Sequence, residues 1–181
     1  DQAVSRGLGD VYKRQADNKP MIDEKLNTWV APFFMAPINT KNIHRSNALM
    51  NHFYGKDFCY NEMWIQGTGD KGKSAADFIS SSNPLSNAPE PGEGPSRESR
   101  ENGSYDLLFC GDVGNESVHI SVSGDMDPGY GSTSKMIAES AICLVKECLD
   151  LPGGIYTPAP AMGNKLIKRL EKNAGLVFKK E

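Results

Sequence analysis

The chain has 181 residues, a formal net charge of −3 and 24% charged residues. A mildly acidic chain without a basic run argues against nucleic acid as a partner. No uninterrupted apolar stretch approaches the roughly 18 residues that cross a bilayer. We therefore expect a cytoplasmic protein without a transmembrane segment, and a peripheral position at a membrane remains an alternative.

The first 15 residues are predicted to be an artefact. Residues 5–15 have neither a helical apolar stripe nor a strand alternation that continues beyond residue 15. Back-translation of residues 10–15 as GAT GTG TAT AAG AGA CAG gives the end of a common transposase adaptor, and residues 5–9 fit the bases before it. We expect the natural frame to begin inside a gene at Ala16, which leaves residues 16–181 as one folded domain. The alternative is a natural basic arm.

Cysteine and histidine spacing indicates neither a disulfide framework nor a metal site. The four cysteines are predicted to be reduced, mostly buried thiols; they are Cys59, Cys110, Cys143 and Cys148.

The first half is predicted to hold an extended segment, a helix and a strand. The apolar run 29–35 is broken by Pro32, so an extended segment fits it best. A helix capped at Asn39 or Thr40 is expected through about residue 52, with Ile43, Ala48 and Leu49 on its buried side. Residues 57–66 fit a strand. Residues 80–103 are rich in Ser, Pro and Gly and predict a long loop with at most a short helix at 97–101.

The second half predicts a hairpin, two helices and a short strand. Residues 105–112 and 116–123 alternate like paired strands, which makes His119 a surface or half-buried strand residue. Helices are expected at about 132–149 and 162–173, and a strand at 176–178. The first of these helices is predicted to bury a 3.6-residue stripe made of Met136, Ile137, Ser140, Ala141, Leu144, Val145 and Cys148. The fold class is therefore α+β, with a mostly antiparallel or mixed sheet covered by helices.

Two glycine-rich segments could be mistaken for phosphate sites. Residues 67–72 fit GxGxxG, but the stretch after them is the Ser/Pro/Gly loop instead of a second parallel strand, so an ordinary turn is favoured. Residues 127–135 read DPGYGSTSK before a helix, whose free amides could hold an anion. The favoured interpretation is a turn with a cap from Ser132 or Thr133.

Four ordered blocks resemble one family: INTKNIHRSNALMNHFYGKDFCYNEM, PGEGPSRESRENGSY, GDMDPGYGSTSKMIAESAICL and GGIYTPAPAMGNKLIKRLEKNAGLVF. They resemble the carboxy-terminal half of saccharopine dehydrogenase-like oxidoreductases, the group that includes the trans-acting enoyl reductases. The similarity covers nearly all of residues 27–178. It implies an α+β, substrate-side domain whose amino-terminal Rossmann partner, with the NAD(P) site, is missing from this chain.

The resemblance implies a small-molecule or lipid substrate, such as a lipid-linked enoyl group, and NAD(P) for the parent but not for this fragment, which alone is expected to be inactive. Among its polar residues, Tyr130 could donate a proton, and Arg45, Asn47 and Lys135 could bind substrate. A structural hydrogen bond or a solvated position is the alternative for each.

Other interpretations remain open for the whole chain. It could be a non-catalytic lipid- or protein-binding module that kept the fold, or a nucleotide-binding domain built on residues 67–72. A surface normally covered by the missing domain, with residues 29–35 as its expected part, would favour association, so homo-oligomers are expected.

Overall fold

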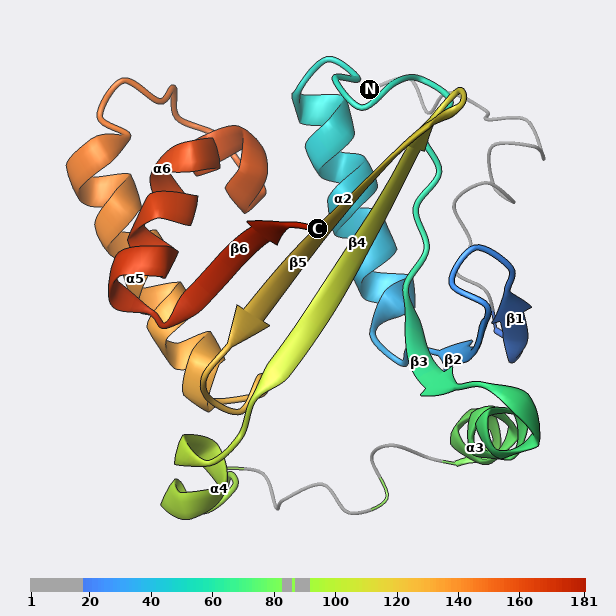
Figure 1. Cartoon of the computed structure of the whole chain (residues 1–181). Coiled ribbons are helices and arrows are strands. Elements are labelled where there is room, and N and C mark those ends of the chain that lie inside the picture. The colour runs from blue at the N-terminus through green and yellow to red at the C-terminus, as the bar shows by residue number, and fades with distance from the viewer. Residues whose placement is uncertain (1–17, 83–85, 87–91) are drawn as a thin grey trace. The chain divides into compact units, whose positions relative to one another are not determined.

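A computed structural model describes residues 18–82, 86 and 92–181 (Figure 1). The predicted adaptor segment, residues 5–15, lies outside the described residues. The chain divides between residues 88 and 89 into two compact units.

The first unit contains a three-stranded antiparallel sheet. Its strands are β1 (Met21–Asp23), β2 (Thr28–Pro32) and β3 (Met63–Gly67), in that spatial order. Helix α3 (Gly69–Ser81) packs against β2 and β3, and its Ala76 is fully buried, as is Ala31 of β2. The extended segment predicted over 29–35 is confirmed by β2 as far as Pro32, and the residues after it turn into the helix that follows. The strand predicted over 57–66 begins later, at Met63.

Helix α2 (Ala36–Leu49) differs from its prediction in both start and buried face. It begins three residues before Asn39, because Pro37 fits the first turn of a helix, where its missing N–H needs no partner. Its buried residues are mostly polar: Ala36, Thr40, Ser46 and Asn47. The predicted burial of Ala48 is wrong, since this residue is exposed. Ile43 and Leu49 are half-buried. The contacts of the helix include the hydrogen bonds of Asn47 to the turn after it and the His44 ring, 5.6 Å from that of Phe58.

The second unit contains the hairpin and the two long helices. Its elements are α4 (Arg97–Glu101), β4 (Tyr105–Val113), β5 (Glu116–Gly124), α5 (Gly131–Glu147), α6 (Pro158–Asn173) and β6 (Leu176–Lys180). The sheet is antiparallel in the order β4-β5-β6, and the predicted hairpin is confirmed over nine residue pairs. The short helix predicted inside the 80–103 loop is α4. Within α6, Gly163 has φ 48° and ψ −133°, so the regular helix follows it.

The core of this unit forms where α6 meets the sheet. Val122 of β5 and Leu176 of β6 pack with Leu170 and Ala174 at the end of α6. A second apolar cluster joins Cys143, Cys148 and Met162 between α5 and α6. The sequence correctly placed these two cysteines in the core, but Cys59 and Cys110 are exposed. The prediction of mostly buried thiols is therefore wrong for half of them.

The buried face of α5 was predicted only in part: Met136 packs against the core and Cys148 is buried, but four of the seven predicted residues are exposed, namely Ile137, Ala141, Leu144 and Val145. Ile137 and Val145 are exposed, at 70% and 72%, while Cys143 is fully buried. Apolar residues occur on more than one side of α5, and periodicity alone cannot decide which side α6 covers. The contacting side carries Glu139, which forms an ion pair with α6.

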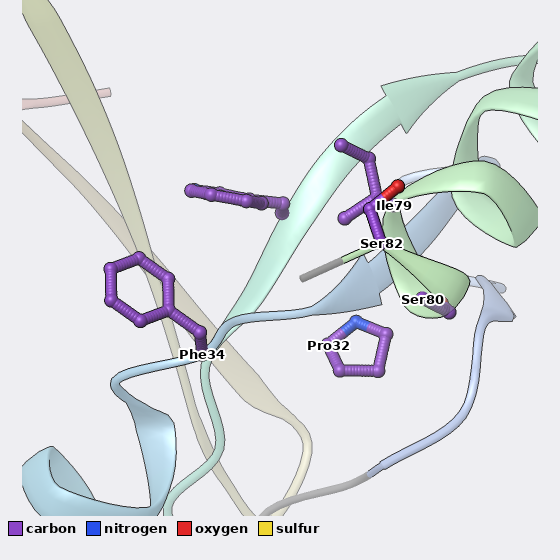
Figure 2. A pocket seen from close by; sticks show the side chains of 6 residues that line it. Pro32, Phe34, Ile79, Ser80 and Ser82 are labelled. Carbon is purple, nitrogen blue, oxygen red and sulfur yellow. The ribbon is translucent and has the colours of Figure 1, made fainter. Parts of the chain in front are cut away.

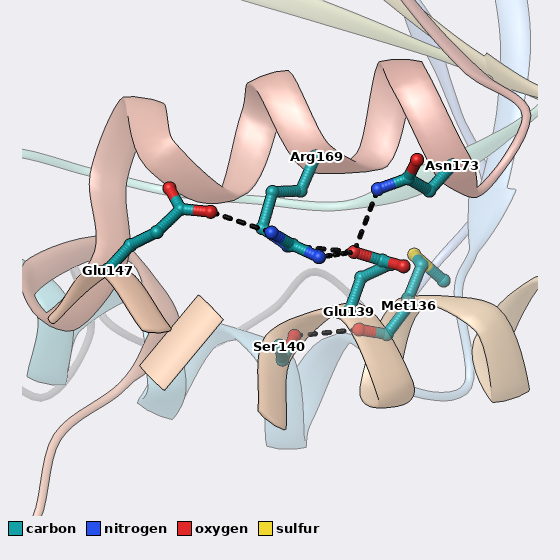
Figure 3. A network of polar contacts seen from close by, with 6 residues as sticks. All are labelled: Met136, Glu139, Ser140, Glu147, Arg169 and Asn173. Atoms are coloured by element: carbon teal, nitrogen blue, oxygen red, sulfur yellow. Dashed lines mark hydrogen bonds and ion pairs between the residues drawn. The ribbon is translucent and has the colours of Figure 1, made fainter. Parts of the chain in front are cut away.

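An ion-pair network ties α5 to α6 (Figure 3). Arg169 of α6 lies between two carboxylates of α5, with its Nη2 2.6 Å from Glu139 Oε2 and its Nη1 2.7 Å from Glu147 Oε1. Asn173 Nδ2 donates a further hydrogen bond to Glu139 Oε2 at 3.1 Å. Hydrogen bonds from Asn173 and Arg169 lower the pKa of Glu139. The arginine side chain is only 19% exposed, so this network is better shielded than a typical surface pair.

The molecule is therefore an α+β protein with antiparallel sheets and helices packed against them, as the sequence predicted. The difference is that the strands form two small sheets, one in each unit. Within the described residues, no helix is both long enough and apolar enough to cross a membrane.

Candidate functional site

The four residues predicted to act on substrate are divided between the two units. Arg45 and Asn47 belong to α2 in the first unit, and Tyr130 and Lys135 lie at the start of α5 in the second. Their predicted roles in substrate binding and proton donation remain predictions.

The loop that opens α5 is organised by Asp127. Its carboxylate accepts hydrogen bonds from the backbone N–H groups of Gly129 at 2.9 Å, Tyr130 at 3.2 Å and Gly131. The N–H of Gly131 is one of the donors that the first turn of a helix leaves without a partner inside the helix, and Gly129 and Tyr130 directly precede it. The prediction of a cap from Ser132 or Thr133 is wrong, because Asp127 performs that role four residues ahead of Gly131. An external anion at these amides would have to displace it.

This arrangement favours the ionised form of the Asp127 carboxyl group. Burial acts to raise its pKa, but the three backbone N–H groups and the charge of Arg100 outweigh that and lower it. The backbone of Asp127 is also held, since its N–H donates to the Arg100 carbonyl at 3.0 Å and its carbonyl accepts from Ser132 N at 2.9 Å. The loop is thus fixed to α4 on one side and to α5 on the other.

Tyr130 lies on this loop with an available hydroxyl. Its side chain is 49% exposed, and its hydroxyl makes no hydrogen bond with the described residues. Its ring lies beside Gly94, close enough that a Cβ added there would touch it at 3.4 Å. Lys135, one turn into α5, has its Nζ 3.8 Å from Asp125 Oδ1; the Lys135 side chain is half-buried and that of Asp125 is largely exposed. A phenol hydroxyl and an ammonium group therefore lie near the start of the same helix.

Asn47 has a structural task in α2. Its Nδ2 donates to the Gly55 carbonyl and its Oδ1 accepts from Tyr54 N, both at 2.9 Å. These bonds close a turn in which Asn51 and His52 adopt the left-handed conformation, with φ of 54° and 61°. Such values are costly for residues other than glycine, so the turn needs outside support.

Arg45, two residues before Asn47, is exposed. It makes no hydrogen bond or ion pair within the described part of the chain. Its guanidinium is available for a carboxylate or phosphate, which it can bind through two parallel hydrogen bonds.

A polar cluster that sequence reasoning missed joins α2 to the segment before β3. Asn39 Nδ2 donates to Glu62 Oε2 at 2.9 Å, and the Tyr60 hydroxyl donates to Glu62 Oε1. Burial, followed by the hydrogen bond and charge of Glu62, raises the pKa of Tyr60 above its usual range. Tyr60 therefore stays protonated. The contact spans 23 residues of sequence, and no local pattern could have shown it.

The GxGxxG segment forms a strand-to-helix turn but not a dinucleotide fold. Gly67 ends β3 and Gly69 begins α3, with φ of 101° and 63°. A Cβ at Gly72 would overlap the carbonyl oxygen of Gly67, so this glycine allows helix and strand to approach. The sheet beside it is antiparallel throughout, whereas pyrophosphate binding in a Rossmann fold needs parallel strands around the turn. The described strands around residues 67–72 therefore lack the parallel arrangement of a Rossmann fold.

Comparisons with known proteins relate the chain to trans-acting enoyl reductases. It is 33% identical over 168 residues to the "Putative trans-acting enoyl reductase" of Mycobacterium tuberculosis strain H37Rv, covering 81% of this chain and 40% of that protein. It is 28% identical over 179 residues to the trans-acting enoyl reductase of Mycobacterium ulcerans, covering 88% and 43%. The protein of that name from Mycobacterium bovis strain BCG is 29% identical over 181 residues, with the same coverage.

The chain thus spans about two fifths of the length of these curated relatives. No family model matches it, and no solved structure does.

Proposed function

We propose that this chain is the carboxy-terminal, substrate-side part of an NAD(P)-dependent, saccharopine dehydrogenase-like oxidoreductase that acts on lipid-linked enoyl or related substrates. The observation that carries the proposal is the similarity to trans-acting enoyl reductases over 81–88% of this chain but only 40–43% of theirs. The remaining part of such a protein would hold the nucleotide. The antiparallel sheet beside residues 67–72 supports that division.

In this proposal the loop at the start of α5 handles the substrate. Tyr130 is exposed and its hydroxyl has no partner within the described residues, so it is available to donate a proton. Lys135 could attract a negatively charged substrate group, which would compete with the Asp125 carboxylate 3.8 Å away. Asp127 keeps the loop in one conformation, which is what a positioned donor requires.

Arg45 is proposed to bind a carboxylate or phosphate of the substrate. Asn47 supports it indirectly, because it fixes the end of the helix that carries Arg45. When bound by the rest of the protein, the nicotinamide would supply the hydride.

The experiment uses the longer protein encoded by the parent gene. NADPH consumption is followed with an α,β-unsaturated acyl thioester, for the wild type and for Tyr130→Phe. The proposal predicts consumption in the wild type and a loss of about a hundredfold in kcat for the variant, the size expected for a lost general acid. An upstream reading frame without a Rossmann fingerprint, with no turnover, would favour the non-catalytic binding module instead.

A further inference from the structure

The sheet in which β4, β5 and β6 lie side by side (Figure 1) brings a thiol next to an imidazole. Cys110 of β4 is directly opposite His119 of β5 in the antiparallel register. The backbone N–H of Glu181, which follows β6, donates to the carbonyl of His119 at 3.0 Å. The backbone groups of His119 therefore point toward β6, so Cys110 and His119 are a pair without hydrogen bonds between their backbones.

Pairs of this kind bring their side chains closest. Their Cα atoms are about 4.5 Å apart and their Cβ atoms roughly 4.5–5.5 Å apart. At that separation a thiol and an imidazole can meet by rotation about χ1, without any movement of the strands. Cys110 is exposed and His119 is half-buried, so a small molecule in solution can reach the sulfur.

A carboxylate lies on the same face of the sheet. Side chains alternate along a strand, so Ser121 shares the face of His119. Ser121 Oγ donates to Glu181 Oε1 at 2.6 Å. That hydrogen bond, followed by the hydrogen bond and charge of Lys179, lowers the pKa of Glu181. An ionised carboxylate on this face favours the protonated form of a nearby imidazole.

A thiol beside a base is the arrangement that activates cysteine. The thiolate is the nucleophile, and an ordinary thiol with a pKa of about 8.5 is mostly protonated at neutral pH. A neighbouring imidazole can accept its proton. The other exposed thiol differs, because Cys59 Sγ donates to the Asp57 carbonyl at 3.5 Å, and a carbonyl is too weak a base to take the proton. The two exposed thiols should therefore differ in reactivity.

We propose that Cys110 is a modification site, at which a mixed disulfide forms with a small disulfide compound while His119 accepts the thiol proton. The Cys110 thiolate attacks one sulfur of the compound, the S–S bond of the compound breaks, and the departing thiolate takes the proton from His119. Cys110 is oxidised and the departing half is reduced to a thiol, so the disulfide compound is the only oxidant required. The site is independent of the proposed oxidoreductase function.

The test follows mixed-disulfide formation with cystamine on the 181-residue protein, cysteine by cysteine, from the masses of peptides after an acid quench. Cys59 is the internal reference, and unreacted Cys143 and Cys148, which are buried, show that the protein stays folded. We expect Cys110 to react at least about tenfold faster than Cys59 at about pH 6.5. The ratio should shrink at about pH 9, where an ordinary thiol ionises without a base. Equal rates at about pH 6.5, or a ratio that does not change with pH, would overturn the proposal.

A matched pair of variants separates the effect of the imidazole from simple exposure. His119→Gln removes the base and keeps a polar side chain, whereas Ser123→Ala changes another residue on the same face of β5, opposite Asp106. His119→Gln should slow the reaction of Cys110 at least about tenfold at about pH 6.5 and leave that of Cys59 unchanged. Ser123→Ala should change either rate by less than about twofold. An undiminished Cys110 rate in His119→Gln would overturn the proposal. If that variant does not fold, the pH dependence of the wild-type ratio decides alone.

Discussion

The carboxylate of Asp127 accepts a hydrogen bond from the backbone N–H of Gly131, the first residue of α5. This contact replaces the serine or threonine cap that the sequence suggested. It also occupies the amides that could otherwise have held an anionic ligand. Hydrogen bonds within this loop thus fix the backbone that carries Tyr130 at the start of α5.

Replacing Asp127 should destabilise the second unit. Asp127→Ala is expected to cost about 1–2 kcal/mol in the free energy of unfolding, the usual range for a lost cap, and Asp127→Asn less, because one acceptor oxygen remains. Urea unfolding measures both. Asp150→Asn, an exposed carboxylate just after α5, is the control and should stay within about 0.5 kcal/mol. Equal effects at the two positions would contradict the capping role.

The contribution of Asp127 should also depend on pH. Its pKa is lower in the folded state than its usual value, so the stabilisation is fully present above the pKa of the unfolded chain, about 3.9. It is lost as pH falls through the lower, folded-state pKa. The difference in stability between wild type and Asp127→Asn should therefore be largest near neutral pH and shrink in acid. A difference that grew in acid would have the wrong sign.

Removing Arg169 should loosen α5 from α6. Arg169→Gln leaves the carboxylates of Glu139 and Glu147 without their shared cation, so the melting temperature should fall. Because the arginine helps to lower the pKa of Glu139, the loss should be greatest at neutral pH and smaller once the carboxyls are protonated. Arg97→Gln is the matched control, since Arg97 is 81% exposed and its pairing with Glu101 should be worth less than about 1 kcal/mol. An equal fall for both variants would show that the network adds nothing.

The glycines at residues 67–72 are expected to be required for close packing of α3 against β3. Gly72→Ala brings a Cβ into the Gly67 carbonyl, an overlap with backbone that should cost about 1–3 kcal/mol or more. In Gly69→Ala the new Cβ meets no atom within 4 Å. The backbone φ of 63° is unfavourable for alanine and should lower the free energy of unfolding by about 1 kcal/mol. Chemical denaturation compares the two. Gly69→Ala proving the more damaging of the pair would contradict this explanation.

Variants at Asn47 and Arg45 should distinguish a structural role from a role in substrate binding. Asn47→Ala removes both bonds that close the turn after α2 and should cost about 1–3 kcal/mol. Arg45→Ala, two residues away and exposed, should change stability by less than about 0.5 kcal/mol. In the longer protein, Arg45→Ala should instead lower kcat/KM while the melting temperature stays the same. Unchanged kinetics would leave Arg45 as a solvated surface residue.

Local patterns predicted those elements whose signal lies within a few residues. The β4–β5 hairpin alternates and turns at Gly114, which has φ 60°, and α5 and α6 carry helical periodicity, so all three were found. The predicted buried face of α2 was wrong because three of the four buried residues of this helix, Thr40, Ser46 and Asn47, are polar and form no apolar stripe. The Asp-Pro-Gly start of the α5 loop is a known turn signal and could have identified the Asp127 cap.

The missed parts of the candidate site depend on contacts between distant segments. Asn39 and Glu62 meet across 23 residues, and Arg169 and Glu139 across 30. The walls of a pocket in the first unit (Figure 2), which come from β2, β3 and α3, likewise come together only when this unit folds. A residue such as Tyr130 can be proposed as a candidate from its chemical type in the sequence. Its contacts can be known only from the folded structure.

The division of labour between this chain and the rest of its parent is the central claim, and calorimetric titration with NADPH tests it most directly. The titration is carried out on the 181-residue chain and on the longer protein. The account predicts micromolar binding by the longer protein and no measurable heat of binding for the chain alone. Micromolar binding of NADPH to the chain alone would contradict it.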